Sequence, residues 1–228
     1  MQYNSWLYLF PFLGGSLILY YLLPIKRRWI GLLFSSLLFY ILTMKSLVLV
    51  VLFTTAAIYL GARVIEQFNE TFKLKKKELD RAARKELKNK TTTKIRYVIA
   101  FLCFINFGIL FVTKYFNFFG ENINALFNAL HIPAQIPFLN IFLPLGISFY
   151  TLSAISYVTD VARGVCKVER NYLRLLLFLI FFPVITEGPI SRYGQLGEEL
   201  KAEHRFDYKQ FCFGAQLITC LLYTSDAA

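Results

Sequence analysis

Apolar residues in this chain are gathered into long runs, and short polar or basic segments separate them. The first three runs cover 6–23, 29–43 and 46–62. A helix needs about 20 consecutive apolar residues to cross the hydrocarbon layer, within a range of roughly 17 to 25. The first and third runs meet that length, and the second is short. The pattern predicts three membrane-crossing helices of alternating direction, with a kink in the first at Pro11 and Gly14.

The stretch 63–96 is the most polar part of the chain. It holds twelve Lys and Arg against five Asp and Glu, a net charge of +7, and it contains no Pro or Gly. Its apolar residues recur near helical spacing. We therefore expect the third crossing helix to continue into a basic cytosolic helix over 63–96, lying on the inner headgroups.

The next apolar segments are less regular. Run 97–113 predicts another crossing, and the Asn-rich stretch 114–137 predicts an interfacial helix on the outer side. Run 138–158 predicts a crossing back to the inside. Pro144 and Gly146 break this run near its start, so a straight helix over its full length is not expected.

The last part of the chain carries a second break. Segment 175–185 is too short for a regular crossing and ends near Pro183, which predicts a re-entrant or broken helix. Such irregular backbone at membrane depth must be enclosed by protein or line a wet cavity. Run 211–222 begins a further helix. We expect 1–222 to be a partial transmembrane domain and 223–228 to be a non-native tail.

Composition agrees with a membrane protein and excludes a soluble globular domain. Hydrophobic residues make up 57% of the 228, and the formal net charge is +11. No motif that reads nucleic acid accompanies the charge, so membrane lipids rather than nucleic acid are the expected partner. Basic loops stay on the cytosolic side, which predicts that 26–28 and 63–96 lie inside and the N-terminus outside.

Motifs of soluble enzymes and metal sites are missing from the sequence. The four cysteines form no CxxC pair, so neither a disulfide framework nor a metal site is expected. The two histidines, His131 and His204, stand in polar segments outside the apolar runs. Each is interpreted as a solvated loop residue rather than a catalytic base.

Two segments stand out as candidate chemistry. The first, 143–164, is rich in hydroxyls within an apolar helix and ends in an aspartate; its candidate funnel-lining or substrate-lining residues are Ser148, Tyr150, Ser153 and Asp160. Hydroxyls in such a helix need protein or water partners. Helix–helix hydrogen bonding and the lining of a substrate path both remain open for them.

The second segment, 181–193, places Glu187 beside a Gly188–Pro189 break and near Arg192. Charge beside irregular backbone at a membrane edge is costly unless a cavity or a partner uses it. We expect Glu187 and Arg192 to shape the inner mouth of a funnel. The alternative is a local ion pair that only fixes the break.

These two segments carry a resemblance. LPLGISFYTLSAISYVTDVARG at 143–164, followed by FFPVITEGPISRYGQL at 181–196, resembles the membrane-bound O-acyltransferase family, in its alginate O-acetyltransferase-like branch. That branch is related to the membrane protein of D-alanyl transfer to teichoic acids. The likeness runs from about 5 to 216 and includes HRFDY at 204–208. It implies the N-terminal half of an all-α, polytopic helical bundle around a funnel.

The resemblance also implies a function. Such a protein transfers an acyl group, acetyl in this branch, from a donor on the cytosolic side to hydroxyls of an exported polysaccharide or envelope polymer. The donor, acyl-CoA or an acyl carrier protein, is a co-substrate, and no bound cofactor is implied. The family's catalytic histidine lies further downstream, so no catalytic residue is assigned in this chain and the chain alone is expected to be inactive. A bacterial-type plasma membrane and partner proteins of an export or acylation system are implied as well.

A small transporter or channel lined by the hydroxyl-rich helix is the alternative. Transporters typically show repeats with matching broken helices. This chain has two breaks, at 144–146 and 188–189, but no repeated sequence around them. A purely structural scaffold would need only the basic stretch and would explain neither segment.

Overall fold

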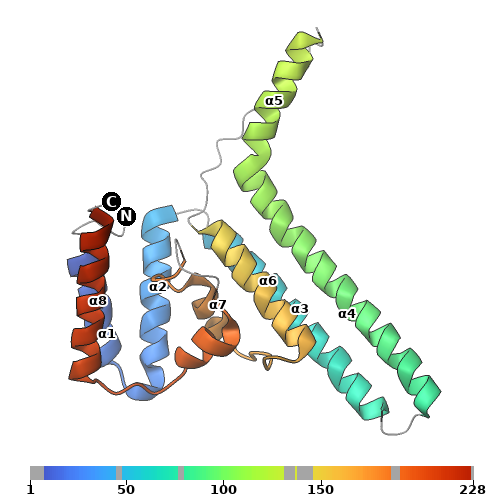
Figure 1. Ribbon diagram of the computed structural model, residues 1–228, viewed down its shortest axis with the longest axis horizontal. Coiled ribbons are helices and arrows are strands. Elements are labelled where there is room, and N and C mark those ends of the chain that lie inside the picture. Colours follow the sequence, from blue (N-terminus) through green and yellow to red (C-terminus); the bar gives the residue numbers. More distant parts are fainter. Residues whose placement is uncertain are drawn as a thin grey trace.

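The computed structural model describes residues 8–44, 48–76, 80–130, 137, 146–185 and 191–226 (Figure 1). All regular elements within those ranges are helical, and eight of them are α-helices. The large apolar side chains that face outward, among them Phe34, Phe53 and Phe104, cover the helix surfaces. By length and composition, the helices Val48–Lys75 and Arg81–Ala129 could each cross a membrane. The protein is an all-α membrane protein.

The first two apolar runs form an antiparallel pair of helices. A π-helical turn, η1 (Tyr8–Leu13), contains Pro11 and leads into α1 (Gly14–Leu22). A 3-10 turn, η2 (Ile25–Arg27), then reverses the chain into α2 (Arg28–Met44). Proline cannot donate the backbone hydrogen bond of a regular helix, and the change from η1 to α1 follows it within three residues. The predicted helices and the irregularity at Pro11 are confirmed.

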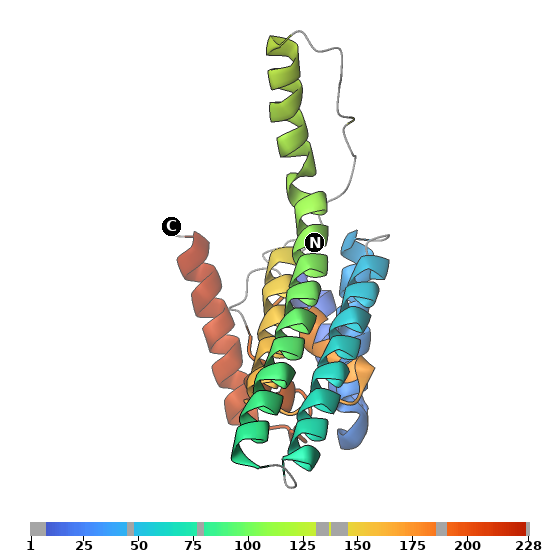
Figure 2. The same cartoon turned by 90° about the vertical axis from the view of Figure 1, so that its right-hand side faces the viewer.

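Helices α3 (Val48–Lys75) and α4 (Arg81–Leu110) form a long antiparallel hairpin (Figure 2). The two helices pack closely at Gly61, where an added methyl group would overlap the side chain of Leu102. The absence of a side chain at Gly61 therefore brings α4 directly against α3. Leu102 is buried there at 4% exposure.

The expectation of one basic helix over 63–96 is wrong. Helix α3 ends at Lys75 and the antiparallel helix α4 begins at Arg81, so this stretch is divided between the end of α3 and the first turns of α4. Asp80 is extended, and its carboxylate accepts a hydrogen bond of 2.7 Å from the Arg81 amide, which makes it the N-cap of α4. Closely spaced lysines before it, Lys73, Lys75 and Lys76, also disfavour a continued helix because like charges repel within a turn.

The helix continues past α4 through a π-helical turn, η4 (Phe111–Tyr115), into α5 (Phe116–Ala129). Figure 2 shows α5 extending beyond the other helices. The stretch predicted as a separate interfacial helix is therefore a helical continuation of α4. Its large apolar side chains, including Phe118 and Leu126, are exposed.

Helix α6 (Ile147–Arg163) packs against both α3 and α4. It is bounded by glycines in the left-handed conformation, Gly146 at φ +67° and Gly164 at φ +75°. Gly146 explains the predicted break near 144–146, since a left-handed residue cannot continue a right-handed helix. The expected helical start at 138 lies outside the described residues, as does Pro144.

Two short elements follow α6, and the longer last helix comes after them. Helix α7 (Tyr172–Ile180) has nine residues, a length of roughly 14 Å at 1.5 Å per residue. It ends in a turn at 182–185 that contains Pro183. The π-helical turn η5 (Tyr193–Gly197) and helix α8 (Tyr208–Asp226) complete the described chain. The prediction that 175–185 is too short for a regular crossing is confirmed.

Helix α7 forms the centre of the core. It contacts α2, α3, α6 and η5, and its residues from Leu175 to Ile180 are all at most 4% exposed. The phenolic hydroxyl of Tyr172 donates to the Leu52 carbonyl of α3 at 3.0 Å. At the other end, the Phe182 amide donates to the Ser36 hydroxyl of α2 at 3.3 Å. The broken segment is thus enclosed by protein.

One end of the bundle gathers the basic turns. Figure 1 shows the α1–α2 turn, the α3–α4 turn and the start of α8 at its lower side, while the N-terminus and C-terminus lie at the upper side. Basic residues stand at these described turns: Lys26 to Arg28 before and at the start of α2, Lys73 and Lys75 at the end of α3, and Arg81, Arg84 and Lys85 at the start of α4. We call this lower side the basic end.

The two left-handed glycines provide a matched pair of substitutions. We expect Gly164→Ala to destabilise the protein by about 1 to 2 kcal/mol, the cost of a left-handed alanine. Gly146→Ala should destabilise it by more, because the added methyl group would also overlap the Ile185 carbonyl, whereas nothing lies near Gly164. Thermal denaturation of both variants in detergent checks this order. Equal losses would show that the contact at Ile185 relaxes freely.

Candidate functional site

The hydroxyl-rich face of α6 is turned partly against α3. Tyr150 is buried, and its hydroxyl lies 2.5 Å from the Thr54 hydroxyl and 3.2 Å from that of Thr55. It also donates to the Val51 carbonyl at 3.4 Å. For Tyr150 the structure therefore shows the helix–helix hydrogen bonding that was one of the two alternatives.

The other candidate residues of α6 are half-buried. Ser148, Ser153 and Asp160 follow the same helix at positions that are neither closed nor fully exposed. Ser153 and Tyr150 border a void of about 10 Å³ between α6, α7 and Ser191. A void of that size scarcely holds one water molecule. The described parts of α6 and α7 thus leave little space for a substrate at Ser153, and a substrate-lining role for Ser148, Ser153 and Asp160 stays a prediction.

The second candidate segment, 181–193, is described at both ends, 181–185 and 191–193. Arg192 is exposed, and its carbonyl accepts hydrogen bonds from the amides of Gln195 and Leu196, both at 3.1 Å, at the start of η5. Glu187 and the Gly188–Pro189 break lie outside the described residues. The pairing of Glu187 with Arg192 stays a prediction.

Sequence reasoning missed a buried carboxylate, Glu169, in the loop between α6 and α7. Only 8% of the residue is exposed. Its Oε2 accepts a hydrogen bond of 2.6 Å from the Tyr193 hydroxyl and lies 2.7 Å from Lys201 Nζ. Its Oε1 accepts from the Asn171 amide at 2.9 Å. Every oxygen of this carboxylate therefore has a partner.

Aromatic rings complete the environment of Glu169. The Glu169 amide donates to the Tyr157 hydroxyl at 2.9 Å, and the rings of Tyr157 and Tyr193 lie 4.9 Å apart. Lys201 Nζ lies 4.9 Å from the centre of the Tyr193 ring, in cation–π range. We call Tyr157, Glu169, Tyr193 and Lys201 the Glu169 cluster. It ties α6, the α6–α7 loop and η5 together at the basic end.

The charge state of Glu169 follows from these contacts. Burial alone would raise its pKa, but the hydrogen bonds from Lys201, Tyr193 and the Asn171 amide outweigh burial and leave the pKa below its ordinary value. The carboxylate is therefore ionised at neutral pH. It holds the segment that follows the Gly188–Pro189 break.

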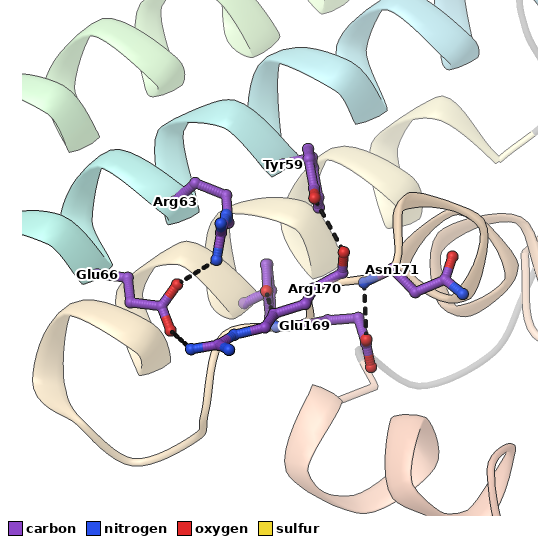
Figure 3. A network of polar contacts seen from close by, with 7 residues as sticks. Tyr59, Arg63, Glu66, Glu169, Arg170 and Asn171 are labelled. Atoms are coloured by element: carbon purple, nitrogen blue, oxygen red, sulfur yellow. Dashed lines mark hydrogen bonds and ion pairs between the residues drawn. The ribbon is translucent and has the colours of Figure 1, made fainter.

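A second ionic network joins the same loop to α3 (Figure 3). Glu66 pairs with Arg63 at 2.7 Å and with Arg170 at 3.4 Å. The Tyr59 hydroxyl donates to the Arg170 carbonyl at 2.9 Å. Asn171 follows directly and caps α7, since its side-chain oxygen accepts from the Leu173 amide at 3.0 Å. The loop is fixed on both sides.

The structure also describes a cysteine and a histidine that could be considered as a nucleophile and a base, Cys166 and His204. Burial, with smaller contributions from the carboxylates of Asp160 and Glu198, raises the pKa of the Cys166 thiol to about 11. The thiol is protonated at neutral pH and is a poor nucleophile. His204 is exposed, and its Nε2 lies 2.9 Å from the Glu199 carbonyl, which agrees with a loop histidine. His131 lies outside the described residues.

Known proteins resemble this chain along most of its length. It is 31% identical over 201 residues to the probable alginate O-acetylase AlgI of Pseudomonas syringae pv. tomato, which covers 87% of this chain and 34% of the relative. The same protein of Azotobacter vinelandii is 30% identical over 202 residues, covering 87% of this chain and 36% of the relative. This chain belongs to the membrane-bound O-acyltransferase family.

A shorter similarity reaches the second branch of this family. The teichoic acid D-alanyltransferase of Bacillus subtilis is 34% identical over 70 residues, which cover 30% of this chain and 18% of the relative. No family model matches the sequence. No solved structure matches it either. The chain spans about a third of the length of the alginate O-acetylases that it matches.

The low pKa of Glu169 predicts a pH dependence of stability. The ionised carboxylate stabilises the fold above its ordinary pKa of 4.5, and this contribution is lost as the pH falls through the lower folded-state pKa. We expect Glu169→Gln to lower the melting temperature at pH 7 and to flatten its fall below pH 4.5. Melting curves in detergent between about pH 3 and pH 7 measure both effects.

The matched control is Glu198→Gln. Glu198 contacts the same lysine at 3.3 Å, but its side chain is 64% exposed. This variant should keep both the melting temperature and the acid-side fall of the parent. An identical pH profile for Glu169→Gln and Glu198→Gln would contradict the assigned role of the buried carboxylate.

Proposed function

We propose that this chain is part of an O-acyltransferase that moves an acyl group onto hydroxyls of an exported polysaccharide or a cell-envelope polymer. The observation that carries the proposal is the similarity to alginate O-acetylases across 87% of the chain. The D-alanyltransferase similarity supports the same reaction class with a different acyl group and polymer. Within this class, acetyl transfer is the favoured reaction, because the alginate O-acetylases match a larger part of the chain.

The reaction needs a donor and an acceptor on opposite sides of the membrane. In this proposal the basic end faces the cytosol, where an acyl-CoA or an acyl carrier protein supplies the acyl group as a thioester. The many Lys and Arg of that end suit both the cytosolic side and the phosphates of such donors. The chain crosses a bacterial-type plasma membrane several times, with its N-terminus outside.

Acyl transfer here requires a base that takes the proton of the acceptor hydroxyl. The oxygen then attacks the thioester carbonyl, and the thiol leaves. No residue of this chain is assigned as that base. In this proposal the chain contributes by positioning other groups. Helix α7 and the turn after it form an enclosed wall, and the Glu169 cluster holds the chain after the Gly188–Pro189 break. In this proposal Glu187 and Arg192 stand at the inner mouth of the acyl path.

No observation favours the transporter alternative. Of the half-buried hydroxyls of α6, Ser153 borders a void of only about 10 Å³. The relatives named above are acyltransferases.

The proposed topology can be tested by labelling. In a variant whose native cysteines are replaced by serine, Lys76→Cys at the α3–α4 turn should react with a membrane-impermeant maleimide only after the cells are permeabilised. Asn122→Cys on α5, at the far side of the bundle, should react in intact cells, since Asn122 is exposed. Labelling of Lys76→Cys in intact cells would reverse the orientation.

The proposed activity can be tested in the full-length protein. Membranes that contain it should transfer labelled acetyl from acetyl-CoA or an acetylated carrier protein to alginate or another envelope polymer. Glu187→Gln and Arg192→Ala should each lower this transfer by at least about tenfold at unchanged expression, because small errors of position cost that much.

The matched control removes one negative and one positive charge from residues further along the chain than the segment 181–193. Glu203 and Arg205 are exposed and make no ion pair among the described residues. Glu203→Gln and Arg205→Ala should keep the parent rate. Full activity in both test variants would mean that Glu187 and Arg192 only hold the loop, and absence of transfer by the parent would refute the reaction class.

A further inference from the structure

A pocket of about 530 Å³ opens near the basic end between α3, α4 and α6. Three cations border it, Lys88 and Arg96 from α4 and Arg163 from α6. Hydroxyl and amide groups also border it, and no Asp or Glu does so among the residues that the structure describes. The lining therefore offers hydrogen-bond donors and positive charge to a single ligand.

The three cations are not neutralised by neighbouring carboxylates. Within the ranges that the structure describes, Lys88, Arg96 and Arg163 make no ion pair. Other cations of the same region are paired: Lys90 lies 2.7 Å from Glu86, and Arg170 lies 3.4 Å from Glu66. This pocket therefore gathers three cations without an ion-pair partner among the described residues, which favours an anion.

A second pocket nearby differs in charge, because carboxylates border it as well as cations. It has about 490 Å³ and lies between α3 and the α6–α7 loop, where Glu66 and Glu70 border it together with Lys73, Lys167 and Arg170. Its carboxylates offset its cations, and Glu66 is already bound to Arg170. Of these two neighbours, only the pocket between α3, α4 and α6 has the charge of an anion site.

The order of polar and apolar residues along the pocket favours a ligand that has an apolar part as well as an anionic group. Along α4, the lining passes from Lys88 through Thr91 and Thr92 to Ile95 and Ile99, a rise of roughly 16 Å at 1.5 Å per residue. The cations extend along the pocket from Lys88 to Arg96, and Ile95 and Ile99 lead toward the exposed apolar surface of α4. A ligand with an anionic head and a hydrocarbon tail matches this order.

We propose that this pocket binds the phosphate of one anionic phospholipid, with its acyl chains along the apolar surface of α4. Basic pockets between transmembrane helices recognise anionic headgroups through Lys and Arg, while threonine hydroxyls donate to phosphate oxygens. The bound lipid joins the α3–α4 hairpin to α6. This site lies apart from the Glu169 cluster and is independent of the acyl group that the protein transfers.

The test uses the whole chain, purified in mild detergent, and phosphatidylglycerol as the probe. Native mass spectrometry and titration with a fluorescent phosphatidylglycerol should show one tightly held lipid and a preference over phosphatidylcholine. The triple variant Lys88→Gln/Arg96→Gln/Arg163→Gln should weaken binding by on the order of a hundredfold, since each Lys or Arg contributes roughly a fivefold factor near anionic lipid.

A charge-matched control separates this site from general surface attraction. Arg81→Gln/Arg84→Gln/Lys85→Gln removes the same charge from exposed residues of α4 that do not border the pocket. It should bind like the parent. Equal weakening in both triple variants, or unchanged binding in the first, would overturn the proposal.

Two further measurements keep the outcome clear if the triple variant folds poorly. Ala162→Phe adds volume to the pocket from α6 without changing charge, and it should also displace the lipid. Inorganic phosphate at millimolar concentration should not compete with phosphatidylglycerol. Lipid binding by Ala162→Phe at parent affinity, or full displacement by inorganic phosphate, would show that no phospholipid occupies the pocket.

Discussion

The structure depends on one constraint: a helix too short to cross the bilayer must satisfy its backbone inside protein. Helix α7 has nine residues, and its two ends expose amides and carbonyls that lipid cannot bind. The surrounding helices supply the partners. Asn171 caps the start, and Ser36 of α2 accepts from the amide that follows the end. Helices α2, α3 and α6 are therefore arranged around α7, and the Glu169 cluster closes the side toward η5.

Polar side chains act mainly as connections between these helices. Tyr150 bonds α6 to Thr54 of α3, and Tyr172 bonds α7 to the backbone of α3. In an apolar surrounding, such bonds supply specificity that hydrophobic contact alone lacks, because lipid tails are as apolar as leucine. The ionic networks of Glu66 and Glu169 continue this pattern at the basic end. The cations around the pocket between α3, α4 and α6 depart from this pattern, because no carboxylate of the described residues pairs with them.

The sequence predicted those features that depend on local pattern. The apolar runs gave the first helices, Gly146 gave the break before α6, and the short run with Pro183 gave α7. The reversal at 76–80 was missed, although Asp80 carries the local signal of an N-cap, because the absence of Pro and Gly favoured a continuous helix. Glu169 was missed for a different reason. Its partners Tyr193 and Lys201 stand 24 and 32 residues later, and only the folded chain brings them together.

The close approach of Gly146 to the Ile185 carbonyl has a mechanical consequence. The start of α6 and the turn after α7 touch through their backbones, with no side chain between them to absorb a displacement. Side chains can change rotamer when two elements slide, but two backbones in contact transmit the displacement directly. We therefore expect an axial shift of α6 to be passed to the turn at 182–185.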